Sequence, residues 1–174
     1  MRAAVETASL LDVERAVVVL DSLLDLQLAT EETLDAAYRA RVRWPHSRKL
    51  QVAVRLARRG SQSVAESRLR WICFVHGLPM PELQFGVIGA DGTTYFVDMA
   101  WPDRGLIVEV DGKVKYADPP SGQTPADVLF REKRREDMLR EATGWRVIRV
   151  TWWDLEHPQR LVKRLRDALG LSAA

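Results

Sequence analysis

Three acidic residues, Asp98, Glu109 and Asp111, interrupt sequence that is otherwise typical of buried β-strands. The residues around them, 95–101 and 106–110, are mainly aromatic, β-branched or aliphatic. An ionised carboxylate in such a strand is costly unless a cation lies beside it. The acids therefore predict a neighbouring divalent metal ion or a neighbouring basic side chain.

The spacing of these acids predicts that they meet on a β-hairpin. Residues 102–105, Pro-Asp-Arg-Gly, favour a turn, so the strands on either side should pair antiparallel. Because side chains alternate along a strand, Glu109 and Asp111 share one face, and the pairing brings Asp98 within reach of that face. Carboxylates from two neighbouring strands can bind Mg²⁺, with water and substrate phosphate as the other ligands.

An ion pair is the alternative interpretation. A strand predicted at 145–151 carries Arg146 and Arg149, and either arginine could neutralise an acid of the hairpin. The residues themselves leave the metal site and the ion pair equally open.

Composition restricts the class of protein. The chain has 174 residues and a net charge of +2, with 47% hydrophobic and 29% charged residues, which fits one globular domain with a small appendage. Cys73 is the only cysteine, which excludes an internal disulfide and a thiolate metal cluster and fits a reducing cytoplasm. No apolar run has the length of a membrane span, so we expect a cytoplasmic protein without a membrane partner.

The pattern along the chain predicts a helical region at 1–60 and an α/β domain at 61–174. The helical region is rich in arginine, which indicates either a phosphate-facing surface or a solvated helical face. At the start of the second region, Ser63 and Glu66 have the spacing of a capping box for a helix that ends near Val75. Glu66 is therefore either a helix cap or a residue of the site.

The second region has the order helix, three strands, helix, strand, helix. Strands are predicted at 83–88, 95–101, 106–110 and 145–151, and helices at 63–75, 124–143 and 158–169. Short turns join the first three strands, so these should pair antiparallel, and the helical connection permits a parallel fourth strand. We expect a mixed four-stranded sheet with helices packed on it.

The long helix carries arginines on the arc that should face the sheet. With 3.6 residues per turn, Arg131 and Arg135 share an arc with Val128 and Leu139, whereas Lys133 points away. Inward-facing arginines predict an anion, which can be a buried carboxylate or a phosphate group.

In their order along the chain, these motifs resemble a known family. The resemblance is carried by Glu66-Ser-Arg-Leu-Arg70, Val97-Asp98, Val108-Glu-Val-Asp-Gly-Lys113, Glu132-Lys-Arg-Arg-Glu-Asp137 and Gly144-Trp-Arg-Val-Ile-Arg149. Together they are similar to the bacterial domain family related to very-short-patch-repair (Vsr) endonucleases, within the PD-(D/E)XK nuclease superfamily. The resemblance covers roughly residues 62–155.

This resemblance implies an αβββαβ restriction-endonuclease-like core and hydrolysis of a phosphodiester that depends on Mg²⁺, with Mn²⁺ as a second suitable ion. By the motif match, Asp98 is the central metal ligand, Glu109 the second acid, and Glu66 the acid on the helix. The basic helix supplies the residues expected to bind nucleic acid, which are Arg131, Lys133, Arg134 and Arg135. Of these, Arg131 and Arg135 are the ones expected to stabilise developing charge.

At one position the chain departs from the superfamily pattern. The pattern has a lysine two residues after the second acid, where this chain has Asp111. Lys113 or Lys115 would take its place, although Gly112 between them and the acids favours a bulge or bend. We expect Lys113, the nearer residue, to contact the attacking water or the phosphate, and Lys115 to contact the nucleic-acid backbone.

The function that follows from this resemblance is a Mg²⁺-dependent endonuclease acting on DNA. One alternative is a non-catalytic nucleic-acid-binding or antitoxin-like module, and another is an RNA-cleaving toxin. Members of such families also form the C-terminal part of longer proteins with a winged-helix-like N-terminal region, and some resemble toxin–antitoxin components. An antitoxin or an N-terminal regulatory domain is therefore an implied partner.

Overall fold

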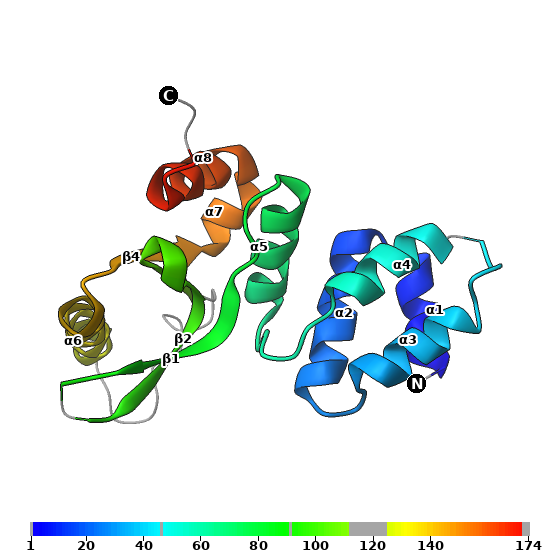
Figure 1. The fold of residues 1–174 in the computed structure, drawn as a ribbon, viewed down its shortest axis with the longest axis horizontal. Helices are drawn as coiled ribbons and strands as arrows, with labels where there is room; N and C mark the ends of the chain where they lie inside the picture. Colours follow the sequence, from blue (N-terminus) through cyan, green and yellow to red (C-terminus); the bar gives the residue numbers. More distant parts are fainter. Residues whose placement is uncertain (1, 46, 91, 112–124, 172–174) are drawn as a thin grey trace. The chain divides into compact units, whose positions relative to one another are not determined.

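The computed structural model describes residues 2–45, 47–90, 92–111 and 125–171 (Figure 1). The chain divides into two compact units, Met1–Val75 and His76–Ala174. The boundary follows the helix that ends at Val75, whereas the sequence pattern placed a boundary before that helix.

Unit 1, Met1–Val75, is built from helices. They are α1 (Arg2–Leu10), α2 (Val13–Asp25), α3 (Glu31–Arg39), α4 (Ser47–Leu56) and α5 (Val64–Val75). Polar side chains define where α2 and α3 begin: Asp12 accepts a hydrogen bond from the Arg15 N–H before α2, and Thr30 and Thr33 form a capping box at α3.

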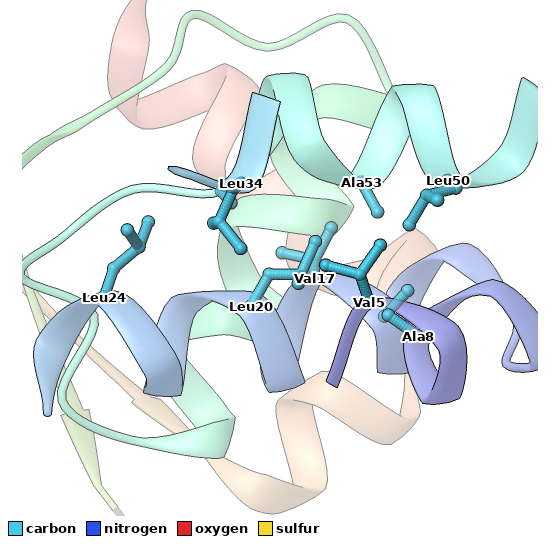
Figure 2. Close-up of a cluster of buried hydrophobic side chains, with 10 residues drawn as sticks. Val5, Ala8, Val17, Leu20, Leu24, Leu34, Leu50 and Ala53 are labelled. Atoms are coloured by element: carbon cyan, nitrogen blue, oxygen red, sulfur yellow. The ribbon is translucent and has the colours of Figure 1, made fainter. Parts of the chain in front are cut away.

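The hydrophobic core of unit 1 lies between α1, α2, α3 and α4, whose apolar side chains point toward one another (Figure 2). Leu20 of α2 is fully buried at its centre, and Leu34 of α3 and Leu50 of α4 are each 1% exposed. Burial of a leucine side chain stabilises a fold by about 1.5–3 kcal/mol. The periodic apolar residues therefore account for the packing of these helices.

A buried ion pair connects α2 and α5. The Arg70 Nη1 atom lies 2.6 Å from Asp21 Oδ2, and the two side chains are 3% and 0% exposed. Asp21 also accepts a hydrogen bond from the Arg58 main-chain N–H. Burial raises the pKa of the Asp21 carboxyl above its ordinary value, and the charge of Arg70 opposes that rise.

Unit 2, His76–Ala174, is an α/β unit. Its strands are β1 (Glu82–Ile88), β2 (Thr94–Trp101), β3 (Leu106–Asp111) and β4 (Arg146–Thr151), and its helices are the 3-10 turn η1 (Pro102–Arg104), α6 (Pro125–Thr143), α7 (Trp152–Glu156) and α8 (Pro158–Leu169). The sheet has the order β1-β2-β3-β4. The pairs β1–β2 and β2–β3 are antiparallel and β3–β4 is parallel, which confirms the predicted mixed four-stranded sheet.

Helix α6 connects β3 to the parallel strand β4 and packs on the sheet. Its Leu139 is buried in a cluster with Val87 of β1, Val97 and Ala100 of β2, and Ile107 of β3. Leu139 lies one helical turn after Arg135. Its burial against the strands therefore fixes which basic residues of α6 face the sheet.

A glycine turn lets β3 begin beside β4. Gly105 has a φ of 57°, and a Cβ atom there would lie 3.5 Å from the Trp145 ring. The Gly105 carbonyl accepts a hydrogen bond from the Arg146 N–H at 2.9 Å, which starts the parallel pairing. In the part of the chain that the structure describes, no helix combines the length and apolar character needed to cross a membrane.

Candidate functional site

The site is centred where the ladder between β2 and β3 ends. The last backbone pair is Met99 with Val108, so Asp98 and Glu109 occupy the next position on each strand. In place of a ladder bond, Asp98 Oδ2 accepts the Val110 main-chain N–H at 2.7 Å. This hydrogen bond fixes the Asp98 carboxylate at β3, beside Glu109.

The two oxygens of Asp98 differ in their surroundings. Oδ2 is engaged by Val110, and Oδ1 makes no hydrogen bond or ion pair with any residue that the structure describes. Asp98 is half-buried, and the Glu109 side chain is 22% exposed. The Asp98 carboxylate is thus fixed in position, and the Glu109 carboxylate is exposed enough for a ligand from solvent to reach it.

Arg135 of α6 joins the two strands at this point. Its Nη2 atom donates to the Phe96 carbonyl of β2 at 2.5 Å and lies 3.3 Å from Glu109 Oε1 of β3. The prediction that Arg135 faces an anion is confirmed, and the anion in this structure is Glu109. Because the arginine side chain is 43% exposed, it can also reach a bound phosphate.

Asp111 is neutralised by an arginine of the neighbouring strand. Arg149 Nη1 of β4 lies 3.4 Å from Asp111 Oδ2, and Arg149 Nη2 lies 4.0 Å from Glu136 Oε2 of α6. Glu136 in turn pairs with Arg140 at 2.6 Å on the same helix. Of the two interpretations of the hairpin acids, the ion pair with Arg149 therefore holds for Asp111.

The other basic candidates fall into two groups. On α6, the side chains of Lys133 and Arg134 are exposed to solvent. Lys113 and Lys115, together with the side chain of Arg131, lie outside the described residues, so their roles stay predictions.

Glu66 has a defined structural task at the start of α5, in unit 1. Its carboxylate accepts the Gln62 main-chain N–H at 3.0 Å and the Ser63 hydroxyl at 2.7 Å, and Ser63 Oγ accepts the Glu66 N–H at 3.2 Å. The predicted helix cap is confirmed. A role for Glu66 in a metal site stays a prediction.

Asp98 and Glu109 suit a hard divalent cation. Oxygen ligands from two carboxylates, completed by water and a phosphate, are typical of Mg²⁺ sites. Within the described residues, no cluster of three or more His, Cys, Asp or Glu side chains could hold a metal ion. Two carboxylates alone would leave most positions around such an ion to water or to substrate oxygens.

Other chemistry is less well supported. Cys73 is buried in α5, and burial raises the pKa of its thiol to about 12. A thiol in this state is neither a nucleophile nor a metal ligand at neutral pH.

Sequence reasoning missed two features of the site. One is the main-chain N–H of Val110, which has no side-chain signature. The other is Gln84 of β1, which lies opposite Asp98 and has a φ of 48°. The only signal for Gln84 was an uncharged polar residue inside the apolar segment 83–88.

Comparisons with known proteins found relatives without an assigned function. Uncharacterized protein MT2308 and Uncharacterized protein Rv2248, from two strains of Mycobacterium tuberculosis, are each 33% identical to this chain over 168 residues. The alignment covers 93% of this chain, which spans 57% of the length of each curated relative. No family model matches the chain, and no solved structure matches it.

Proposed function

We propose that this protein is a Mg²⁺-dependent endonuclease that hydrolyses phosphodiester bonds in DNA. The observation that carries the proposal is the pair of acids, Asp98 and Glu109, at the point where β2 and β3 cease to pair. The fixed carboxylate of Asp98 and the arginine from α6 at the same point support it. A phosphodiester presents the anionic oxygens that such a combination of metal ligands and cation recognises.

The relationship to the PD-(D/E)XK superfamily is part of this proposal. The order of α5, three antiparallel strands, α6 and a parallel β4 is compatible with the αβββαβ core of that superfamily. The two acids lie on β2 and β3, as the motif resemblance implies.

Each residue has a distinct task in the proposed reaction. Asp98 and Glu109 would hold Mg²⁺, which when bound polarises the phosphate and lowers the pKa of a coordinated water. The Val110 N–H keeps Asp98 oriented, and Arg135 binds a non-bridging oxygen and stabilises the charge that develops there. Water adds to phosphorus, the bond to the leaving oxygen breaks, and that oxygen gains a proton. Lys113 stays the candidate for contact with the attacking water.

A second candidate function is a non-catalytic nucleic-acid-binding or antitoxin-like module. The observation that favours it is the neutralisation of the hairpin acids by protein cations, Glu109 by Arg135 and Asp111 by Arg149. In such a module the acids would stabilise the fold, and the basic side chains of α6 alone would contact the nucleic acid.

The test is incubation of the purified chain with supercoiled plasmid, single-stranded DNA and RNA, each with Mg²⁺, Mn²⁺ or EDTA. We expect nicked and linear plasmid with either metal and none with EDTA. Binding without cleavage would favour the non-catalytic module, and cleavage of RNA alone would favour an RNA-cleaving toxin. Whichever of these outcomes is observed, we propose an antitoxin or a further N-terminal domain as a partner.

A further inference from the structure

Gln84 has an unusual backbone conformation for a residue inside a strand. Only two described residues other than glycine have a positive φ, Gln27 at 57° and Gln84 at 48°. Gln27 follows the end of α2, where the Gln27 N–H bonds to Leu24 and the Leu28 N–H to Leu23, an ordinary left-handed helix ending. Gln84 lies within β1 and has no such local explanation. Its conformation is intrinsically unfavourable, and such strain is concentrated at functional sites.

The side chain of Gln84 carries a second unfavourable feature. Its Nε2 atom is buried and has no hydrogen-bond partner among the described residues. A buried amide donor without an acceptor is destabilising because it has lost its hydrogen bonds to water. A ligand oxygen that accepted this N–H would break no hydrogen bond within the protein. The new hydrogen bond would therefore remove the cost of the unpaired donor without a compensating loss.

The strand register places Gln84 in a row with the two acids. Leu83 pairs with Met99 and Phe85 with Val97, so Gln84 lies opposite Asp98. Met99 pairs with Val108, so Asp98 lies opposite Glu109. The regular pairing is interrupted at this row on both sides of β2. The strained, unpartnered glutamine therefore coincides with the candidate site.

We propose that Gln84 is a substrate-contacting residue of this site, whose side-chain amide donates a hydrogen bond to a phosphate oxygen bound beside Asp98. The inference rests on the proposed function and adds a neutral donor from β1 to the acids of β2 and β3. An amide nitrogen cannot coordinate a metal ion, so its chemical complement is an anionic oxygen of the substrate. Rotation of the flexible Gln84 side chain exchanges an unsatisfied donor for a hydrogen bond to that oxygen.

The test compares Gln84→Ala and Gln84→Gly with the parent, with Asp98→Asn, and with Gln27→Gly as a matched control. Gln27 is also a left-handed glutamine, but it lies in unit 1. Binding of fluorescein-labelled DNA duplex and RNA is measured in Ca²⁺, cleavage in Mg²⁺, Mn²⁺ affinity by calorimetry, and the melting temperature by circular dichroism.

We expect both Gln84 variants to bind the nucleic acid about tenfold more weakly, the effect of one lost hydrogen bond to a charged group. Their Mn²⁺ affinity should equal that of the parent, whereas Asp98→Asn should lose it. Gln84→Gly should melt at a higher temperature than Gln84→Ala because glycine adopts a positive φ without strain. Gln27→Gly should bind and cleave like the parent.

The outcomes separate the two proposals. If the parent cleaves, and both Gln84 variants bind and cleave as well as the parent does, Gln84 is not a substrate contact and the endonuclease proposal stands. If Gln84→Gly regains parental binding while Gln84→Ala does not, the role of Gln84 is conformational and the inference is overturned. If the parent neither binds nor cleaves any substrate, the proposed function fails, and the assignment of Gln84 fails with it.

Discussion

In the proposed site, Asp98 both accepts the Val110 N–H and binds the metal ion, and a single substitution separates these two roles. In Asp98→Asn the amide oxygen can still accept the Val110 N–H, but the charge needed for a metal ligand is gone. We expect cleavage to fall at least about a hundredfold, the order seen when one electrostatic group is removed from an active site. The melting temperature should change little, because the hydrogen bond is retained.

The matched control for this prediction is Asp103→Asn, which alters an exposed acid of η1 outside the row. It should cleave like the parent. Parental activity in Asp98→Asn would instead point to another site or to a contaminating nuclease.

Arg135 can act either as the counter-ion of Glu109 or as a ligand of the substrate phosphate, and Arg135→Met distinguishes these roles. Removal of the guanidinium relieves Glu109 of a competing cation, so Mn²⁺ should bind a few-fold more tightly. If Arg135 also binds phosphate, kcat should fall although the metal binds better. Stability should change by less than about 1 kcal/mol, because the pair is partly exposed.

Calorimetric Mn²⁺ titration and single-turnover cleavage give the two readouts for Arg135→Met. Arg140→Met is the control, since Arg140 lies on the same helix and pairs with Glu136. Unchanged kcat with tighter metal binding would leave Arg135 only the counter-ion role.

At the scale of elements, the buried pair of Asp21 and Arg70 makes the attachment of α5 to α2 sensitive to pH. Arg70→Met should destabilise unit 1 by about 3–5 kcal/mol at neutral pH, because it leaves a buried carboxylate unpaired. Burial would then raise the pKa of Asp21 further, opposed only by the hydrogen bonds from the Arg58 main-chain N–H and the Ser67 side chain. The folded state would hold a proton that the unfolded chain releases near the ordinary value of 3.8, so stability falls as pH rises above that value.

Urea unfolding of the parent and Arg70→Met between pH 4 and 8 measures this effect, and the difference between them should grow with pH. The double variant Asp21→Asn/Arg70→Met carries no titrating carboxyl at this position. Its own free energy of unfolding should therefore lack the fall with rising pH that Asp21 contributes in Arg70→Met. A difference that shrinks as pH rises would contradict the mechanism.

The elements that were predicted well from the sequence are those with local start and stop signals at their ends. Helix α8 begins at Pro158 and ends before Gly170, which has a φ of 68°, and both residues are standard signals for those positions. Helix α7 was missed although Thr151 and Asp154 form its capping box, because its two tryptophans favour a continued strand. In a segment this short, the helix signal of the capping box and the strand preference of the tryptophans are of similar weight.

The site was predictable only where periodicity decides it. The helical repeat predicted that Arg135 faces the sheet, and strand alternation predicted that Asp98 and Glu109 are close. The choice of Arg149 over Arg146 as the partner of Asp111 depends on the register of a parallel strand that is distant in sequence. The left-handed conformation of Gln84 has no local sequence signature, and its position opposite Asp98 depends on the pairing of β1 with β2.

For the whole molecule, the division into two compact units predicts that a substitution in the core of one unit lowers the stability of that unit and leaves the other unchanged. Leu20 belongs to the core of unit 1, and Leu139 to the cluster under α6 in unit 2. Leu20→Ala should destabilise unit 1 by about 2–5 kcal/mol, through lost burial and the cavity it leaves. Asp98, Glu109 and Arg135 all lie in unit 2, so Mn²⁺ binding should survive in this variant.

Hydrogen exchange of the full chain tests this prediction, because protection reports the free energy of opening for each segment. In Leu20→Ala, protection should fall in α2 and α4 and remain near parental in β3 and β4. Leu139→Ala is the matched control, with the expected losses in β2 and β3 and parental protection in α2. If either variant lowers protection equally across both units, the chain unfolds as one cooperative body, and substitutions in the helical unit would then change activity simply by depleting the folded state.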